Sequence, residues 1–197
     1  MVNSYIAETR SAVRGIFDLL ANEKKRLAKT QESYACIADA TKTLYQGMQR
    51  EGADSADIVE LYGLEASRVQ FSKEIAEIRS LVFQLSPTYN ALAAALLQIA
   101  KQGISSKHGG LSKCPNGRLI GQTEFLKNVI WQGRNQTMHY EEGQYRRDVN
   151  ECFTNLVNDF GPKFTLGTKN LALMVIDVLG WDNYVDYEKD METVIPG

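Results

Sequence analysis

A single apolar stripe at helical spacing runs through the first quarter of the chain. Its side chains recur at steps of mostly three, four and seven residues, which is the pattern of one buried helix face. The members are Ile6, Val13, Ile16, Phe17, Leu20, Leu27, Tyr34, Ile37, Ala38, Leu44, Tyr45 and Met48. This spacing predicts one amphipathic helix of about 40 residues or more. A helix of that length is typical of an all-α fold.

A second stripe follows a polar break at residues 50–57. Gly52 is a natural helix stop, and Asp54 or Ser55 is a natural N-cap for the next helix. The second stripe consists of Ile58, Leu61, Leu64, Phe71, Ile75, Ile78, Val82 and Leu85. Two long helices joined by a short turn predict an antiparallel hairpin over residues 1–86.

The rest of the chain also has helical patterns. Pro87, with Ser86 as its N-cap, predicts the start of a third helix, followed by an irregular loop at 101–118. Further helices are predicted at 119–132, 149–160 and 166–180, with a polar tail from Trp181. No strand-like alternation exceeds four residues. We therefore expect one all-α domain over 1–197, an up-and-down bundle with motif-bearing helices at 87–180.

Composition limits the function classes. The chain has 197 residues, 44% of them apolar, and a net charge of −2, which argues against a globally basic nucleic-acid binder but not against a local basic cleft. Its three cysteines contain no CxxC pair, and "CPNG" at 114–117 lacks further zinc ligands. The start has no apolar signal segment, and the longest uncharged apolar run, 90–100, is too short for a membrane span. We expect a cytoplasmic protein with no metal, cofactor or membrane partner.

The stretch "GRNQTMHY" at 133–140 gathers residues suited to phosphate chemistry. Gly133 is expected to end one helix, and Asn135 or Thr137 to cap the next. In that next helix Asn135 and His139 would share a face, whereas Arg134 would stand about 140° from His139. The free N–H groups of such a helix start would suit an anion. Histidine moves protons, arginine holds phosphate, and together they can cut a phosphodiester that has a 2′-hydroxyl.

These residues resemble the signature of the HEPN (higher eukaryotes and prokaryotes nucleotide-binding) superfamily. That signature is an Arg, four to six residues and a His, often with Asn, Asp or His directly after the Arg; here it would be Arg134-Asn135-Gln136-Thr137-Met138-His139. The resemblance implies an all-α, commonly dimeric, metal-independent endoribonuclease of toxin or abortive-infection (antiviral defence) type. It also implies catalytic roles for Arg134, Asn135 and His139, a homodimer and an RNA substrate. An antitoxin or regulatory protein partner is a further implication.

One departure concerns that partner. Family toxins paired with a nucleotidyltransferase antitoxin often have a tyrosine two places after the His, where this chain has Glu141, and Tyr140 is adjacent instead. This difference argues against that particular antitoxin.

Other cations are candidates for holding RNA phosphates, namely Lys127, Arg146, Arg147 and Arg118. Alternatives remain open at this level. Arg134 could pair with Glu141 or Glu142, His139 could be solvated, and Trp131 could fill the core rather than stack on a base. Glu124 is a candidate polar neighbour of the motif, and His108 is expected on the surface. The chain as a whole could be a non-catalytic binding or assembly protein that uses its hairpin, or a nucleotide sensor.

Overall fold

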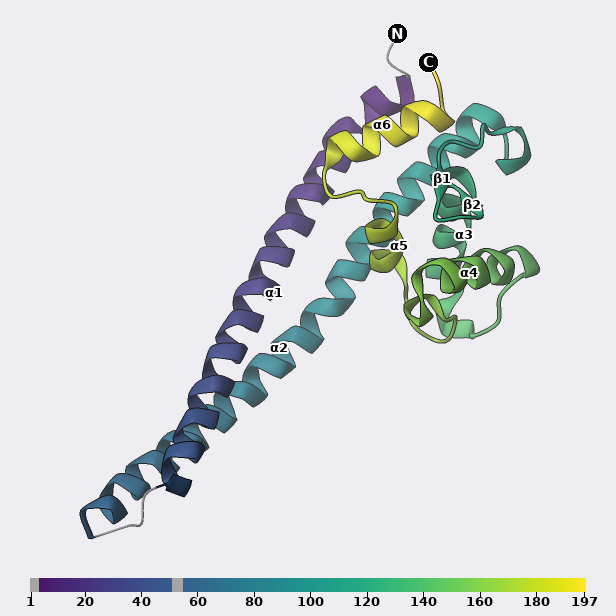
Figure 1. The fold of residues 1–197 in the computed structure, drawn as a ribbon. Coiled ribbons are helices and arrows are strands. Elements are labelled where there is room, and N and C mark those ends of the chain that lie inside the picture. The colour runs from purple at the N-terminus through teal and green to yellow at the C-terminus, as the bar shows by residue number, and fades with distance from the viewer. Residues whose placement is uncertain (1–3, 51–54) are drawn as a thin grey trace. The chain divides into compact units, whose positions relative to one another are not determined.

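The chain forms an all-α fold, as the hydrophobic patterning predicts (Figure 1). The computed structural model describes residues 4–50 and 55–197, with side chains left aside at several positions between 23 and 86. Its two long helices are α1 (Ser4–Arg50) and α2 (Ser55–His108). The chain divides into two compact units, Asn22–Pro87 and a second that combines Met1–Ala21 with Thr88–Gly197.

The Asn22–Pro87 unit forms most of the hairpin predicted over 1–86, and α1 and α2 run side by side in it (Figure 1), whereas the start of α1 belongs to the other unit. Members of both apolar stripes are half-buried there, among them Tyr34, Ile37, Phe71 and Ile75. None of the described side chains in this unit is buried, and Tyr62 is 76% exposed. The predicted stop at Gly52 and the cap at Asp54 lie outside the described residues, and Ser55 is the first residue of α2 rather than its N-cap.

The predicted helix start at Pro87 is wrong, because α2 continues through this residue to His108. An internal proline removes one backbone hydrogen bond and costs about 3 kcal/mol. The following segment offsets that cost by burying one face, and the division between the two units falls directly after Pro87. The buried residues of that face are Tyr89, Ala93, Leu96, Leu97, Ala100 and Ile104.

The predicted loop at 101–118 is also helical over its first eight residues. Gly103 lies inside this helical part, although glycine usually weakens a helix and favours a loop. Here it makes room for Tyr5 of α1, whose Cε1 would lie only 2.7 Å from an added Cβ. The Tyr5 hydroxyl donates to the carbonyl oxygen of Ile99 at 2.8 Å. Close approach of two helices, rather than a chain break, explains this glycine.

A small hairpin replaces the first half of the helix predicted at 119–132. Its strands β1 (Leu119–Ile120) and β2 (Glu124–Phe125) pair antiparallel, after the short 3₁₀ helix η1 (Leu111–Lys113). Gly121 turns the chain with a φ of 68°, a conformation that favours glycine. Asp159 accepts bonds from the Gln122 N–H at 2.8 Å and the Thr123 hydroxyl at 3.4 Å. These contacts with a distant segment are invisible to local periodicity.

Helix α3 (Leu126–His139) therefore begins later than predicted and passes through Gly133 without a break. A Cβ at Gly133 would lie 2.8 Å from Cγ1 of Val175, in helix α5 (Ala172–Val178). The glycine thus permits close packing of α3 against α5 and does not end a helix. As a consequence, Asn135 and His139 lie in the C-terminal half of a continuous helix. The predicted helix start with its free N–H groups is absent from this position.

This packing gives a stability prediction. We expect Gly133→Ala to destabilise the protein by about 1 kcal/mol, because overpacking against the stiff Val175 side chain outweighs the gain in helix propensity. In a Val175→Ala background the clash is gone, and the same substitution should raise stability by about 1 kcal/mol. A double-mutant cycle measured by urea unfolding checks the change of sign. Equal effects in both backgrounds would contradict the proposed packing.

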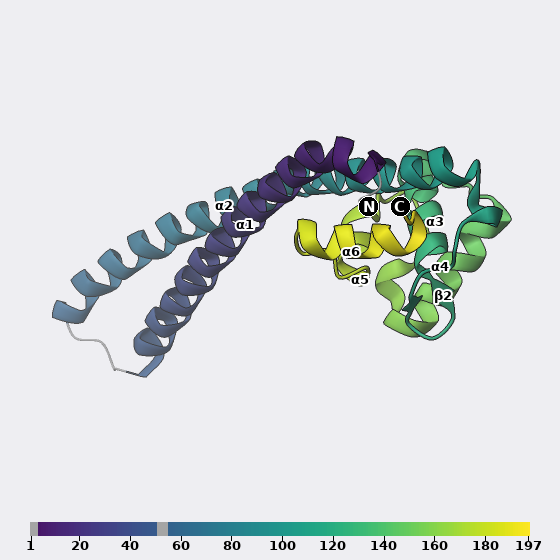
Figure 2. The same cartoon turned by 90° about the horizontal axis from the view of Figure 1, so that it is seen from above.

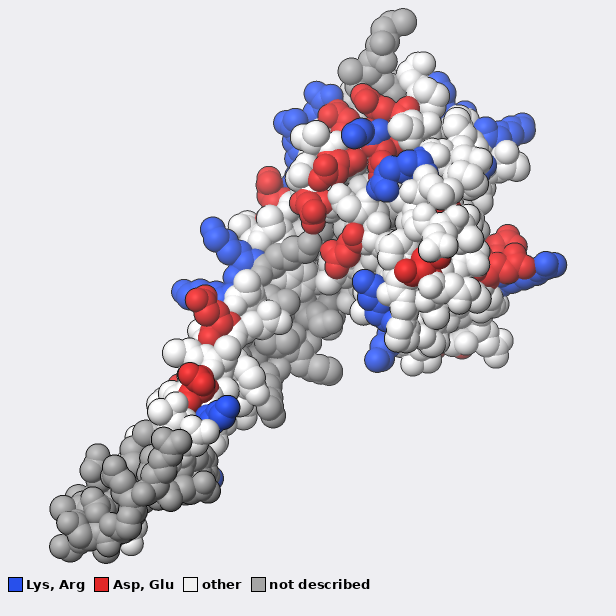
Figure 3. Space-filling model, viewed as in Figure 1, with Lys and Arg blue, Asp and Glu red and all other residues white. Residues whose placement is uncertain are grey.

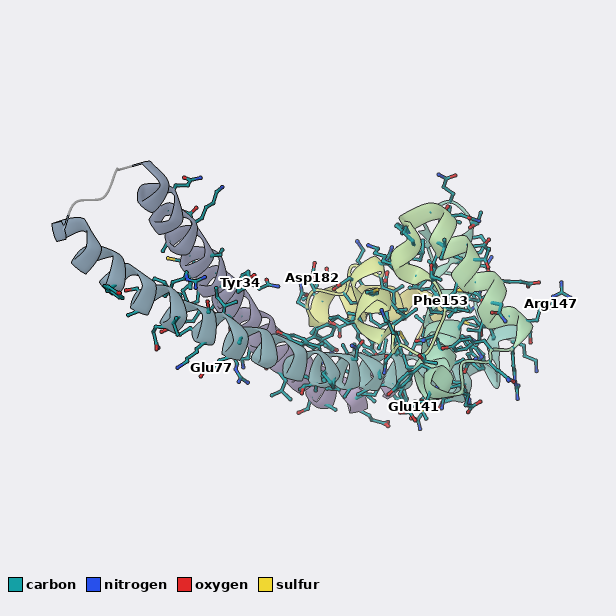
Figure 4. All side chains as sticks on the ribbon, turned by 90° about the horizontal axis from the view of Figure 1, so that it is seen from below. Tyr34, Glu77, Glu141, Arg147, Phe153 and Asp182 are labelled. Atoms are coloured by element: carbon teal, nitrogen blue, oxygen red, sulfur yellow. The ribbon has the colours of Figure 1, made fainter. Side chains whose placement is uncertain are left out.

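Helix α4 (Arg147–Phe160) matches its predicted position closely. It buries Val149, Cys152, Phe153 and Leu156 and packs against α3 (Figures 1 and 2). Phe153, labelled in Figure 4, is buried. Gly161, with a φ of 90°, ends the helix before the 3₁₀ helix η3 (Pro162–Phe164), as the "FGP" sequence predicts.

The end of the chain differs from prediction. The last predicted helix, 166–180, is reduced to the short α5, and the predicted polar tail contains helix α6 (Tyr184–Val194). Asn183 caps α6 by accepting from the N–H groups of Val185 and Asp186. The buried face combines Tyr184, Tyr187, Met191 and Val194 at steps of three, four and three. This helix was not predicted because two of its buried residues are tyrosines that lie among charged residues, so the segment resembles a polar tail.

Candidate functional site

The three predicted motif residues line one groove of about 440 Å³ within the unit that contains residues 88–197. Arg134, Asn135 and His139 come from the end of α3. The other walls come from the 3₁₀ helix η2 (Tyr140–Glu142), the segment that follows it and the start of α4. These walls contribute Glu142, Gln144, Tyr145, Arg146, Asp148 and Val149.

Helix geometry explains how the motif residues come together. Asn135 and His139 are four residues apart on α3 and share a face, as predicted. Arg134 was expected to stand apart from His139, but it lines the same groove. Its long side chain reaches round the helix, and its Nη1 lies 3.4 Å from Oδ1 of Asn135. One chain therefore brings all three residues together.

Arg134 is held by neutral partners. Its Nε donates to Oε1 of Gln98, on α2, at 2.6 Å, and its Nη1 donates to Asn135. Among the described residues it forms no ion pair, so the suggested pairing with Glu141 or Glu142 is wrong. No carboxylate of the described residues therefore neutralises the guanidinium, and its Nη2 has no hydrogen-bond acceptor among them. This charge is available to an anion in the groove.

His139 is the last residue of α3 and is oriented by a carboxylate. Its Nδ1 lies 2.7 Å from Oε1 of Glu142, one turn further along the chain. The two side chains are 53% and 64% exposed, so the pair adds little stability. Its effect is on the tautomer: when Nδ1–H donates to Glu142, Nε2 retains its lone pair and can accept a proton.

A ladder of polar side chains runs inward from the motif. Asn135 donates to Gln132 at 3.1 Å, Gln132 to Asn128 at 3.4 Å and Asn128 to Glu124 at 2.5 Å. The carboxylate of Glu124 is buried, with a second donor in Asn155 at 2.7 Å. Glu124 thus reaches Arg134 through three amides rather than by contact.

The spacing of this ladder is a signal that the sequence analysis missed. Glu124, Asn128 and Gln132 recur every four residues, and Gln132 is only 3% exposed. The neighbouring thiol of Cys152 has a raised pKa because of burial and, secondarily, the charge of Glu124. This thiol is therefore protonated and unsuited to nucleophilic chemistry.

The four cations predicted to hold RNA separate into two groups. Arg146 lines the groove, and its guanidinium has no bond to another described residue. Arg147 projects outward from α4 (Figure 4), where its Nε lies 2.6 Å from Oε1 of Glu151. Lys127 donates to the carbonyl oxygen of Cys114 at 2.8 Å, and Arg118 pairs with Asp190. The structure brings only Arg146 to the motif.

Arg118 belongs to a structural cluster elsewhere in the unit. Its Nε and Nη2 each lie 2.8 Å from an oxygen of Asp190, and Nη2 also donates to the carbonyl of Leu179. The indole N–H of the buried Trp181 donates to the same carboxylate at 2.8 Å. This cluster ties the segment before β1 to α6, and Arg118, Trp181 and Asp190 are not among the residues that line the motif groove.

Two aromatic side chains, Trp131 and Tyr145, line the groove. Trp131 is half-buried there, so the alternative that it fills the core is wrong. The ammonium of Lys101 lies over its ring, 4.4 Å from the centroid. Tyr145 donates to the carbonyl of Gly167 at 2.6 Å and accepts from the buried Gln136 amide at 3.2 Å. Gln136 is thus a structural member of the motif.

His108 and Cys114, in the segment that was predicted to be a loop, both have partners within the protein. His108 is half-buried rather than on the surface, with Nε2 2.7 Å from the carbonyl oxygen of Val194. Burial raises the pKa of the Cys114 thiol, although Lys127 opposes the shift. Within the described residues no three His, Cys, Asp or Glu side chains are grouped to hold a metal ion.

None of the helices in the described part of the chain has the length and apolarity to cross a membrane.

Basic and acidic side chains are interspersed over the face shown in Figure 3. The groove itself also has both signs, with Arg134 and Arg146 opposed by Glu142 and Asp148. Recognition of an anion would therefore depend on local arginine geometry rather than on a broad basic surface. Comparison of the chain with protein-family models, curated proteins and solved structures finds no match in any of the three.

Proposed function

We propose that the protein is a metal-independent endoribonuclease of HEPN type and that the motif groove binds the scissile phosphate. One observation carries the proposal: Arg134, Asn135 and His139 line a single groove, and no carboxylate neutralises the arginine within the described residues. A guanidinium that no carboxylate neutralises, in one groove with an oriented imidazole, supplies a charge for the phosphate and a base for the 2′-hydroxyl.

In the proposed reaction Nε2 of His139 takes the proton of the ribose 2′-hydroxyl. The 2′-oxygen then attacks the adjacent phosphorus, and the bond from phosphorus to the 5′-oxygen breaks. The products are a 2′,3′-cyclic phosphate and a 5′-hydroxyl, whose proton comes from water or from a second imidazole. Arg134 stabilises charge on the phosphoryl oxygens, and Asn135 positions the guanidinium.

The protein would act as a homodimer in this proposal. Each groove contains one histidine, whereas the reaction needs both a base and an acid. A second copy would supply the other imidazole. A role as a cytoplasmic toxin in antiviral defence, restrained by an antitoxin or another regulatory protein, is part of the same proposal.

The experiment incubates the full chain with single-stranded RNA in EDTA and identifies the product ends by mass spectrometry. We expect 2′,3′-cyclic phosphate and 5′-hydroxyl ends, together with complete protection of any bond whose preceding sugar is 2′-deoxy. Loss of activity in EDTA would contradict the metal-independent mechanism. Cleavage at 2′-deoxy positions, or 5′-phosphate products, would contradict 2′-hydroxyl attack.

A second candidate is binding of RNA or a nucleotide without cleavage. It is favoured by the hydrogen-bond partners that Arg134 and His139 have within the chain. Gln98 is the partner of Arg134, and Glu142 is the partner of His139. These bonds could hold the side chains for recognition alone. RNA binding that is lost in Arg134→Ala, with no product from the wild-type chain, would support this candidate over the enzyme.

A further inference from the structure

The two tryptophans of the chain have opposite environments. Trp181 is 1% exposed and its indole N–H is bonded to Asp190, as expected for a core residue. Trp131 is half-buried and belongs to the wall of the motif groove. Most other side chains that line this groove are polar. Filling the core therefore does not explain why an indole is present there.

The position of Trp131 on α3 relates it directly to the motif. Trp131, Asn135 and His139 are separated by four residues each, so they form one row along the helix. Arg134 lies in the adjacent row. The row spans about 12 Å from Trp131 to His139, because an α-helix rises about 1.5 Å per residue. The indole therefore marks one end of the groove and the imidazole the other.

The indole ring is also held in place. Lys101, on α2, places its ammonium over the ring at 4.4 Å from the centroid, which is a cation–π contact. A ring fixed in this way loses little freedom when a ligand binds to it. The contact also keeps a positive charge beside the ring, in addition to Arg134 and Arg146 in the groove.

We propose that Trp131 is a stacking platform for one nucleobase of a single-stranded RNA, while Arg134 and Arg146 bind its phosphates. This inference rests on the proposed function in that it assigns a nucleic acid to the same groove. Neighbouring stacked bases rise only about 3.4 Å, whereas Trp131 and His139 are about 12 Å apart along the helix. The stacked base and the phosphate at His139 therefore belong to different nucleotides, and the groove takes a strand rather than a mononucleotide.

Stacking on an aromatic ring is tolerant of sequence because every base has a π-face. Trp131 would thus strengthen binding of the strand without selecting one base. Since its contact is remote from the reacting phosphate, it would act equally in the ground state and the transition state. Its loss should accordingly raise KM and leave kcat nearly unchanged.

The test measures binding of a fluorescein-labelled hexamer of 2′-deoxynucleotides, which lacks the internal nucleophile, by fluorescence anisotropy. Trp131→Leu keeps an apolar side chain but removes the π-face, and we expect its Kd to rise about 5- to 150-fold. Trp131→Phe keeps a ring and should stay within about threefold of the wild type. Equal affinity in Trp131→Leu and the wild type would overturn the inference, as would equal weakening in both variants.

A second readout follows the tryptophans themselves. Unlabelled hexamer should quench wild-type tryptophan emission, and the quenching should disappear in Trp131→Phe, where only Trp181 remains. Unchanged emission at a hexamer concentration that saturates the anisotropy signal would overturn the platform role. This readout uses wild-type protein and so does not depend on whether the leucine variant folds.

The outcomes separate this inference from the ribonuclease proposal. Quenching without RNA cleavage supports the stacking platform and contradicts the enzyme. Cleavage by Trp131→Leu with wild-type KM contradicts the platform and leaves the enzyme standing. Absence of hexamer and RNA binding by the wild-type chain overturns both.

Discussion

Replacing His139 with alanine is expected to lower the rate of RNA cleavage about 10²- to 10⁴-fold, the usual contribution of one general acid or base. Among the described residues that line the groove, His139 is the only histidine, the residue type most often used as a general base. Glu142 and Asp148 also line the groove, and the Glu142 carboxylate lies against Nδ1 of the imidazole, where it orients the ring. Single-turnover cleavage of a defined RNA measures the effect without interference from product release.

The chain offers a matched control in its other histidine. His108 ends α2 and bonds the carbonyl of Val194, and it is absent from the groove lining. We expect His108→Ala to affect thermal stability but to leave the cleavage rate of folded protein unchanged. Because His139 is 53% exposed, His139→Ala should melt at nearly the wild-type temperature. Full activity in His139→Ala would contradict the assigned base.

Replacing Asp190 with alanine is expected to lower the free energy of unfolding by about 3 kcal/mol. The carboxylate is 5% exposed and accepts two bonds from Arg118 and one from Trp181. Its removal leaves the indole N–H without an acceptor in a buried position. The Arg118 side chain is 46% exposed, so water can solvate it in part, which keeps the loss at the lower end for a broken buried pair.

Glu192→Ala is the matched control for Asp190→Ala. This substitution also removes a carboxylate from α6, but at an exposed position. We expect a change below about 0.5 kcal/mol, as for most surface substitutions. Urea unfolding of the three proteins gives the comparison directly. A loss below about 1 kcal/mol for Asp190→Ala would show that the bonds of Asp190 to Arg118 and Trp181 contribute little to holding α6 in place.

The helices with continuous apolar stripes were the ones that could be predicted. Helix α4 lies where Val149, Cys152, Phe153 and Leu156 place it, because its stripe buries one face against α3. Two predictions based on single helix-breaking residues, Pro87 and Gly133, were wrong, whereas Gly161 ends α4 as predicted. Pro87 and Gly133 both lie inside helices, since packing on either side offset their local cost. Local propensity is a weak preference that tertiary contacts override.

The candidate site shows the same division. The three residues proposed for catalysis, Arg134, Asn135 and His139, could be named because the chemistry of their side chains is specific and their spacing is local. The partners that orient two of them could not be named in advance. Gln98 lies 36 residues before Arg134, and Glu142 was considered only as a partner for the arginine. The structural partners of Arg118 and Lys127 could not be predicted either, because Asp190 and the carbonyl oxygen of Cys114 are distant from them in sequence.

By itself the sequence determined the helical class and the long hairpin, and it supplied the candidate residues for the proposed phosphodiester chemistry, because periodicity and side-chain chemistry are local properties. Only the tertiary structure decided that the motif lies at the end of a continuous helix. It also decided that Arg134 enters the groove of His139 and that Trp131 forms one wall of it. Close packing at Gly133 and hydrogen bonds between distant segments produce these arrangements, and such contacts leave no mark in local spacing.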